Sequence, residues 1–337
     1  MTETVTLGQA KMVIKALAAE QSVMLLSSPG LGKSDVIRSV AEEAGLPLRS
    51  LLGTQIAPED VSGVPRIIGE RAVFCPPRVL LPETPEPFCL FLDELPAASP
   101  DVQKAFYAVL LERRVGEHQL PAGSWVVAAG NRAEDRALVR TISSALVNRV
   151  TILNIRADVM EWLGWAKRAG VRPEIMAFIA AAPEALSRPA PAEPVPFSTP
   201  RAWAALSRSL DLVAEAGGDM AVLRRPLAYG KVSAADAALF CSVADDELAA
   251  LKPPLDYVRL LHSLPDEASK RWFILRRIRD LAASGALASE PPEVIDAFLY
   301  NISTEARFSL FVGMVEIWGE LGADESLMRT LREATGL

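Results

Sequence analysis

Short apolar runs alternate with amphipathic stretches over the first 155 residues of the chain. Strands are predicted over residues 23–26, 48–52, 88–92, 125–129 and 150–155. Those at 23–26, 88–92 and 125–129 are apolar throughout, as is typical of parallel strands that are buried on both faces. The stretches between them predict helices, chiefly over residues 8–20, 34–44 and 99–113. This alternation predicts an α/β fold in which helices cover both faces of a parallel sheet.

Strand patterns disappear after about residue 157. Helices are predicted over 158–169, 173–182, 199–217 and 233–251, and the last 85 residues also have helical patterns. Five prolines between Ser187 and Pro200 predict an extended connector, because proline cannot continue a helix. We therefore expect an α/β domain over 1–156, a helical domain over 157–251, and a helical extension of unknown role over 252–337. A basic face is expected on the helix after Pro265, as a solvated or subunit-contacting surface.

Two hairpins are predicted within the α/β part but outside its sheet. One spans residues 66–75, with its turn at Gly69-Glu70 between apolar residues, and the other spans residues 115–120 around Gly116. A short helix is expected over residues 143–149, before the last strand.

Composition and charge exclude several classes of protein. The chain has 337 residues, a net charge of −7 and a pI near 5.2, which disfavours a nucleic-acid partner although a local basic patch is compatible with it. Its three cysteines and two histidines lack the spacing of a zinc site or a disulfide framework, so a reducing, cytoplasmic compartment is expected. The N-terminus lacks a signal peptide, and no apolar run approaches the roughly eighteen residues that span a bilayer. We therefore expect a soluble protein with no membrane partner.

A phosphate-binding loop is predicted between the first apolar run and the helix that follows it. The turn between a strand and a helix N-terminus directs backbone N–H groups at one point, where the helix dipole favours an anion. In this pattern Lys33 reaches the β- and γ-phosphates and the Ser34 hydroxyl coordinates Mg²⁺. Ser27 stands where the usual pattern has glycine, which would cost roughly 1 kcal/mol if the position required a positive φ. The residues predicted to bind the nucleotide are Ser28, Pro29, Gly30, Leu31, Gly32, Lys33 and Ser34.

Two carboxylates end the apolar run of residues 88–92. The carboxyl ends of parallel strands meet at one edge of the sheet, so Asp93 and Glu94 are expected beside the phosphate loop. Asp93 is placed to hold Mg²⁺ and its water shell, and Glu94 to polarise the attacking water. An Asp-Glu pair is also an ordinary solvated strand end, and the upstream phosphate loop is what favours the functional interpretation.

Three further polar residues are candidates whose ordinary interpretations are strong. Asn131 follows the run of residues 125–129 and would bind the attacking water or the γ-phosphate, although asparagine is often only a turn residue. Arg149 ends the short helix and alone would be taken for a partner of the helix dipole or of a surface acid. Arg201 lies in the first turn of a helix, where a cation opposes the dipole, which suggests weakly that an external anion binds there.

In this order and at similar spacing, these segments resemble the motifs of the AAA+ ATPases, and the MoxR-like group is the nearest match. The resemblance covers about residues 5–250 and rests on Ser28–Ser34, Leu90–Glu94, Ala129–Asn131, Asn148–Arg149 and Thr199–Arg201. It implies a P-loop NTPase domain with a five-stranded parallel sheet, an all-α lid, and ATP and Mg²⁺ as ligands.

The resemblance also assigns roles by position. Lys33 and Ser34 match the Walker A residues, Asp93 and Glu94 the Walker B pair, and Asn131 the first sensor. Arg149 matches the arginine finger, with Arg140 the next candidate, and Arg201 matches the second sensor.

The same resemblance implies an assembly and a task. It predicts a ring, usually a homo-hexamer, with ATP between subunits and with both hairpins lining the pore. The implied function is ATP hydrolysis coupled to remodelling or activation of a client protein, a MoxR-like chaperone role, commonly with a partner that carries a von Willebrand factor A domain. A rubisco-activating role exists among relatives, and nothing in the sequence selects it.

Two other functions remain open. The chain could be a nucleotide-dependent scaffold that binds ATP and assembles but turns over weakly. It could also be a motor acting on nucleic acid, which the acidic net charge disfavours.

Overall fold

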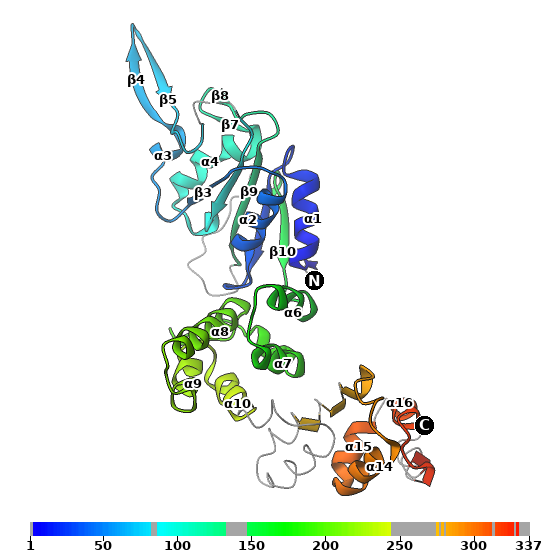
Figure 1. Cartoon of the computed structure of the whole chain (residues 1–337). Helices are drawn as coiled ribbons and strands as arrows, with labels where there is room; N and C mark the ends of the chain where they lie inside the picture. Colours follow the sequence, from blue (N-terminus) through cyan, green and yellow to red (C-terminus); the bar gives the residue numbers. More distant parts are fainter. Residues whose placement is uncertain are drawn as a thin grey trace. The chain divides into compact units, whose positions relative to one another are not determined.

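The computed structural model describes residues 3–81, 86–132, 147–243, 274–275, 278–279, 281–311, 314–326 and 328–329 (Figure 1). The chain divides into two compact units. Unit 1 comprises Met1–Trp165 and Ser187–Ala202, and unit 2 comprises Ala166–Leu186 and Trp203–Leu337. The three-part domain division expected from the sequence remains a prediction.

Unit 1 is built on a parallel six-stranded sheet, and the predicted α/β fold is confirmed. The strand order is β1-β10-β2-β9-β6-β3. The strands are β1 (Thr4–Val5), β2 (Val23–Ser27), β3 (Leu48–Leu52), β6 (Cys89–Asp93), β9 (Trp125–Asn131) and β10 (Thr151–Ile155). The expected number of five strands is wrong, because Thr4 and Val5 pair with Asn154 and Ile155 at the edge of the sheet. A strand of two residues is too short to leave an alternating pattern in the sequence.

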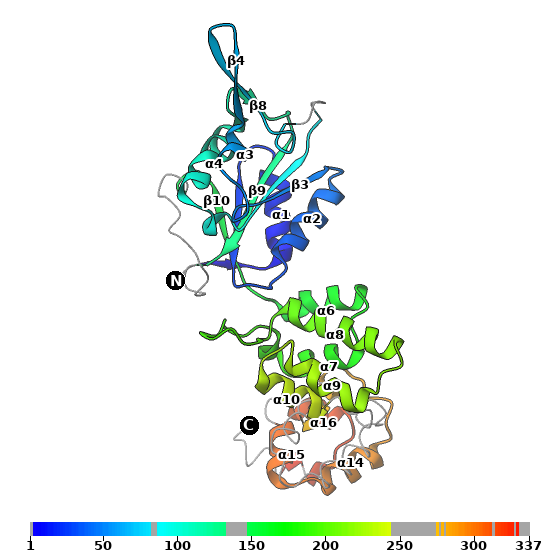
Figure 2. The same cartoon turned by 90° about the vertical axis from the view of Figure 1, so that its left-hand side faces the viewer.

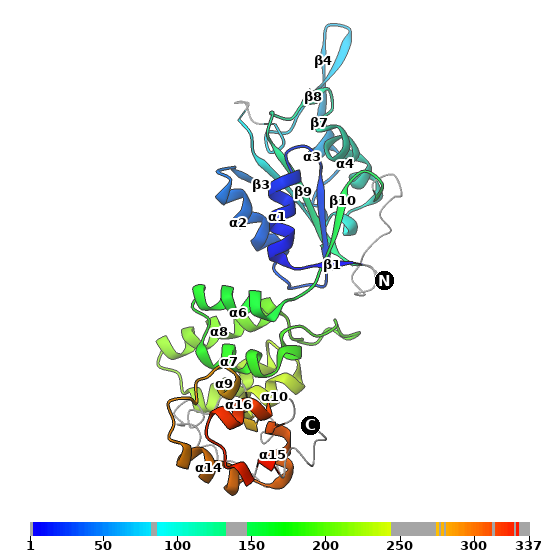
Figure 3. The same cartoon turned by 90° about the vertical axis from the view of Figure 1, so that its right-hand side faces the viewer.

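Helices cover both faces of this sheet, which explains why its central strands are apolar at successive positions. Helices α1 (Leu7–Leu17) and α2 (Lys33–Glu43) lie on one face and α4 (Pro100–Glu112) on the other (Figures 2 and 3). Along β2, Val23 and Leu25 pack in the cluster with α1 and α2, whereas Met24 packs in the cluster with α4. Successive strand side chains point to opposite faces, so each central strand is buried from both sides.

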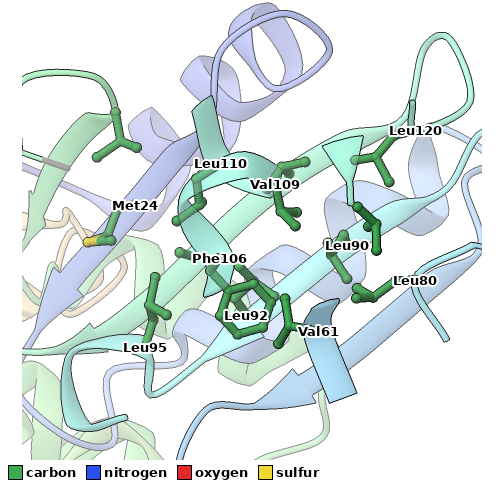
Figure 4. Packing of buried hydrophobic residues seen from close by; sticks show 14 of the residues in the cluster. Met24, Val61, Leu80, Leu90, Leu92, Leu95, Phe106, Val109, Leu110 and Leu120 are labelled. Carbon is green, nitrogen blue, oxygen red and sulfur yellow. The ribbon is translucent and has the colours of Figure 1, made fainter. Parts of the chain in front are cut away.

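The face under α4 holds a dense apolar cluster. Phe106 lies among side chains from the neighbouring strands, including Leu90 and Leu92, and all three are buried (Figure 4). The helix begins where the sequence predicts it, because the Ser99 side chain accepts a hydrogen bond from the Val102 N–H.

Both predicted hairpins are present in unit 1. The larger consists of β4 (Val64–Ile68) and β5 (Arg71–Cys75), which pair antiparallel and extend away from the sheet (Figure 1). The smaller consists of β7 (Arg114–Val115) and β8 (His118–Gln119). A short helix, α3 (Glu59–Ser62), precedes the larger hairpin.

Unit 2 is helical in all its described parts. Two of its helices, α6 (Val159–Arg168) and α8 (Pro200–Glu215), begin in unit 1. The connector over residues 187–199 has no regular structure, as its prolines predict. The helices are α6 (Val159–Arg168), α7 (Pro173–Ala181), α8 (Pro200–Glu215), α9 (Met220–Tyr229), α10 (Ala234–Val243), α14 (Pro292–Asn301), α15 (Thr304–Phe311) and α16 (Val315–Glu320). Phe178, Trp203 and Phe240 form one aromatic cluster of this unit, and Phe298, Phe311 and Trp318 form another.

One helix of unit 2 was not predicted. Helix α9 contains Pro226, which lacks the N–H that an interior helical residue donates and therefore conceals the helix in the sequence. Most of the basic face expected after Pro265, and residues 143–146 of the short predicted helix, lie outside the described residues. None of the helices in the described ranges is both long and apolar enough to cross a bilayer.

Candidate nucleotide site at the carboxyl edge of the sheet

The loop between β2 and α2 has the backbone of an anion-binding turn. Gly30 and Gly32 have φ values of 77° and 99°, in the left-handed region that glycine adopts without strain. No side chain among the described residues caps α2, so the N–H groups of its first turn are available to an anion. A Cβ on Gly30 would also lie 2.6 Å from the Thr199 hydroxyl oxygen, so a side chain is excluded there on two grounds.

Ser27 occupies the first position of this loop without the strain that a positive φ would impose on a serine. It is the last residue of β2 and is fully buried, and its φ is not positive. The conditional cost of about 1 kcal/mol therefore does not arise. Its hydroxyl donates to the Ser28 carbonyl oxygen over 2.8 Å.

The Lys33 ammonium lies at the root of the loop, surrounded by acceptors. Lys33 is the first residue of α2 and is only 8% exposed. Its Nζ donates to the Ser27 hydroxyl over 2.8 Å and lies 3.3 and 3.4 Å from the carbonyl oxygens of Ser27 and Ser28. It also donates to the Asn131 Oδ1 over 3.2 Å. Asn131 reaches it because β9 pairs with β2 in a register that sets Asn131 opposite Ser27.

Ser34 and Asp93 meet on the other side of the loop. The Ser34 hydroxyl donates to the Asp93 Oδ2 over 2.9 Å. Adjacent oxygen ligands of an octahedral Mg²⁺ are about 2.8 to 3.0 Å apart when each metal–oxygen bond is about 2.0 to 2.1 Å, so this pair fits two neighbouring positions. No cluster of three or more acidic, histidine or cysteine side chains suited to a metal occurs among the described residues. The hydroxyl and carboxylate oxygens of Ser34 and Asp93 fit Mg²⁺, which usually takes one or two protein ligands together with phosphate oxygens and waters.

Glu94 follows Asp93 in an unusual conformation. Its φ and ψ are 53° and 30°, and its N–H donates to the Asp93 Oδ1 over 2.9 Å. The Glu94 carboxylate accepts a hydrogen bond of 2.9 Å from the Thr54 hydroxyl. Thr54 is brought there by the strand pairing of β3 with β6, in which Leu52 lies opposite Asp93. The sequence gives no sign of this contact, because Thr54 lies in a loop and carries no motif of its own.

An arginine that directly follows β9 reaches the phosphate loop. Arg132 follows Asn131, and its Nη2 donates to the Ser28 hydroxyl over 3.0 Å. The sequence analysis did not single out Arg132, since its only signal is its position directly after Asn131. The carboxyl edge of the sheet thus joins side chains from the ends of three strands and from the start of α2: Ser27, Lys33, Ser34, Asp93, Glu94 and Asn131.

Arg149 and Arg201 are both exposed side chains of unit 1. Within the part of the chain that the structure describes, neither guanidinium forms a hydrogen bond or an ion pair. The Arg201 N–H donates to the Gly30 carbonyl oxygen over 3.0 Å, which places the start of α8 against the phosphate loop. Among the described residues, Arg149 forms no hydrogen bond with the loop, and Arg140 lies outside the described residues.

Residues 23–155 match the model of a protein family described as "ATPase family associated with various cellular activities (AAA)". The match begins at β2 and ends at β10, so it contains the whole carboxyl edge. This part of the chain is an AAA domain. The MoxR-like group remains a prediction. No curated protein matches the chain.

Solved structures of RuvB from Thermotoga maritima are similar to the chain. One, titled a Holliday junction branch migration motor, is 16% identical with a TM-score of 0.41, over 77% of this chain and 75% of that chain. A point mutant of that protein is 19% identical with a TM-score of 0.42, over 77% and 73%. Both TM-scores lie below 0.5, and such a likeness does not bear on what this chain does.

Proposed function

We propose that this chain hydrolyses ATP in an oligomeric ring and uses the reaction to remodel or activate a client protein. One observation carries the proposal. The Lys33 ammonium, the Asn131 amide oxygen and the Ser34–Asp93 pair lie at the N-terminus of an uncapped helix, within an AAA domain. This is the set of groups that a magnesium–triphosphate complex requires.

The phosphate loop would bind the polyphosphate. The N–H groups of the first turn of α2 would donate to phosphate oxygens, and the Lys33 ammonium would pair with the β- and γ-phosphates. Ser34 and Asp93 would hold Mg²⁺, which when bound neutralises the charge that spreads over the transferring phosphoryl group.

Glu94 and Asn131 would act on the attacking water. A carboxylate orients and polarises water only when its oxygens are free to accept the water's proton. Here Glu94 Oε2 accepts the Thr54 hydroxyl, which fixes the direction of the carboxylate and leaves Oε1 to accept from the water. Asn131, bound to Lys33, would contact the γ-phosphate or the water when the ammonium turns to the nucleotide.

The two exposed arginines would complete the site when subunits assemble. Arg149 would act on the nucleotide of a neighbouring subunit, and Arg201 would respond to the phosphates of its own loop. An arginine finger contributes on the order of 10³ to 10⁵ in rate, so turnover should depend strongly on assembly. A homo-hexamer is the proposed assembly, by resemblance to the MoxR-like group.

The resemblance also supports a client protein and a partner with a von Willebrand factor A domain. Within this proposal, the β4–β5 hairpin would face the pore, where its exposed apolar side chains would contact the client.

A second candidate is a nucleotide-binding scaffold with weak turnover. The hydrogen bond between Thr54 and Glu94 supports it, because a carboxylate that kept this direction with ATP bound would point away from the γ-phosphate and leave ATP intact. Action on nucleic acid is disfavoured by the net charge of −7.

Phosphate release and ATP affinity, measured across protein concentrations, test the proposal. The parent protein should hydrolyse ATP with a rate per subunit that rises with concentration. Glu94→Gln should bind ATP as the parent does and lose about 10² to 10⁴ in rate. Glu112→Gln, which changes an exposed glutamate at the end of α4, is the matched control and should retain full activity.

Each alternative predicts a different result. Tight ATP binding without turnover at any concentration would establish the scaffold, whereas salt-dependent DNA binding that stimulates turnover would favour the nucleic-acid motor. A parent protein that does not bind ATP would refute the proposal.

A further inference from the structure

Ser27 gives this phosphate loop an acceptor that a loop beginning with glycine cannot have. Four acceptors among the described residues lie around the Lys33 ammonium, and the Ser27 hydroxyl oxygen is the nearest of these, at 2.8 Å, against 3.2 to 3.4 Å for the other three. Two of those three are backbone carbonyl oxygens, and the third belongs to Asn131. All three acceptors would remain if residue 27 were glycine. The hydroxyl is therefore the one acceptor for Lys33 that serine adds at this position.

Toward Lys33, the Ser27 hydroxyl acts as an acceptor. A serine hydroxyl has one hydrogen, and in Ser27 that hydrogen is donated to the Ser28 carbonyl oxygen over 2.8 Å. The side chain is fully buried in the sheet, at a backbone conformation that any residue adopts, so little can move it. The oxygen is thereby fixed with its lone pairs available to Lys33.

The ammonium has three N–H groups, and four protein acceptors already surround it. A triphosphate that binds at this loop must take at least one of these N–H groups. The Ser27 hydroxyl holds the closest contact, so it is the acceptor that competes most directly with phosphate oxygens for Lys33.

We infer that Ser27 is a positioning residue that holds Lys33 back and lowers the affinity of the loop for nucleotides with a β-phosphate. This inference rests on the proposed function, since it requires that Lys33 bind nucleotide phosphates. Phosphate binding would draw the ammonium away from the hydroxyl, while the carbonyl oxygens of Ser27 and Ser28 continue to accept from it.

Titration of ATP and of AMP against the full-length parent, Ser27→Ala and Ser27→Gly tests the inference. Both variants should bind ATP about three- to tenfold more tightly, the range that one hydrogen bond is worth. AMP affinity should not change, because AMP lacks the phosphates that Lys33 would contact. Equal effects of Ala and Gly would assign the change to the hydroxyl rather than to the Cβ.

Ser22→Ala is the matched control. Ser22 is also buried, immediately precedes the opposite end of β2, and donates its hydroxyl to the Leu110 carbonyl oxygen over 2.6 Å. It should lose stability on thermal melting while its ATP affinity stays at the parent value. Ser27→Gly supplies the same test should Ser27→Ala fail to fold.

The possible results separate this inference from the function on which it rests. A parent that binds ATP, with Ser27 variants whose ATP affinity is unchanged or weaker, would overturn the role of Ser27 and leave the proposed function intact. Equal changes in ATP and AMP affinity would show that the loop itself was altered, which also overturns it. A parent that does not bind ATP would remove both.

Discussion

The carboxyl edge of the sheet and the β4–β5 hairpin differ in how many partners their side chains have within this chain. At the carboxyl edge, the buried Lys33 ammonium has a full set of acceptors, and Ser34 and Asp93 are paired with each other. At the hairpin, apolar side chains face solvent: Ile67 is 79% exposed and Phe74 is 45% exposed.

The strand register explains the surface of the hairpin. Ile67 lies opposite Ala72, and Pro65 lies opposite Phe74, so one face of the hairpin is apolar throughout. A two-stranded hairpin with no cover is only marginally stable by itself, and exposed apolar faces usually mark interaction surfaces. The groups of the proposed nucleotide site are therefore hydrogen-bonded within this chain, whereas the apolar face of the hairpin is uncovered and is where we expect a partner.

Loss of the Lys33 ammonium should have the largest effect. Lys33→Ala removes the only buried cation contacting the Asn131 oxygen in the described part of the site, and should abolish measurable ATP binding and turnover. The loss of a buried charge partner typically costs about 2 to 5 kcal/mol, or roughly thirty- to several-thousand-fold in affinity. Isothermal titration with ATP and Mg²⁺ measures it, with the exposed Lys104→Ala as control. Tight binding by Lys33→Ala would contradict the assignment of the loop.

Arg149→Ala should lower turnover alone. The side chain is exposed and forms no hydrogen bond or ion pair with another described residue, so its removal should leave ATP affinity within about twofold of the parent. Turnover should fall on the order of 10³-fold at protein concentrations at which the parent is assembled. Full activity in this variant would show that the finger lies elsewhere, with Arg140 the next candidate.

Thr54→Val should raise turnover modestly. Removing the hydroxyl frees the Glu94 carboxylate from a hydrogen bond worth about 1 kcal/mol, which corresponds to about a fivefold change in rate if release from Thr54 limits the reaction. Steady-state phosphate release measures the change. A lower rate would show instead that Thr54 orients Glu94 for its reaction.

A charge on the hairpin should affect partner binding and little else. Ile67→Glu, made in the Glu94→Gln background, should retain fewer co-purifying proteins than Glu94→Gln alone, while ATP affinity is unchanged. Met12→Glu is the control, because Met12 is also a strongly exposed apolar side chain, on α1, at 66%. The free energy of unfolding of both variants should lie within about 0.5 kcal/mol of that of the parent. An unchanged set of retained proteins would refute the role of the hairpin.

The smallest effect should come from a surface carboxylate. Hydrogen bonds from Lys11 and then from Lys15 lower the pKa of Glu43 to about 2. Because the pKa is lowered in the folded state, the group stabilises the fold above pH 4.5 and this contribution is lost as the pH falls towards 2. Glu43→Gln should therefore show a slightly shallower loss of stability between pH 4.5 and 2, measured by denaturant unfolding. A steeper loss would contradict the sign.

Much of unit 1 could be predicted because its physical causes are local. The apolar runs, the glycines of the phosphate loop and the Ser99 cap each act within a few residues of their own position. The features that the sequence did not predict depend on which strands pair, or on a residue that breaks a local rule. Thr54 meets Glu94 only because β3 pairs with β6, β1 exists only as the partner of β10, and Pro226 hides the helix that contains it.

A structure of the assembled Glu94→Gln variant with ATP and Mg²⁺ tests the central claim most directly. We predict that the Lys33 Nζ contacts the β- and γ-phosphates, that Ser34 and Asp93 hold the metal, and that Arg149 of a neighbouring subunit reaches the γ-phosphate. A phosphate loop without nucleotide contacts, with Lys33 still bound to Ser27 and Asn131, would contradict the account.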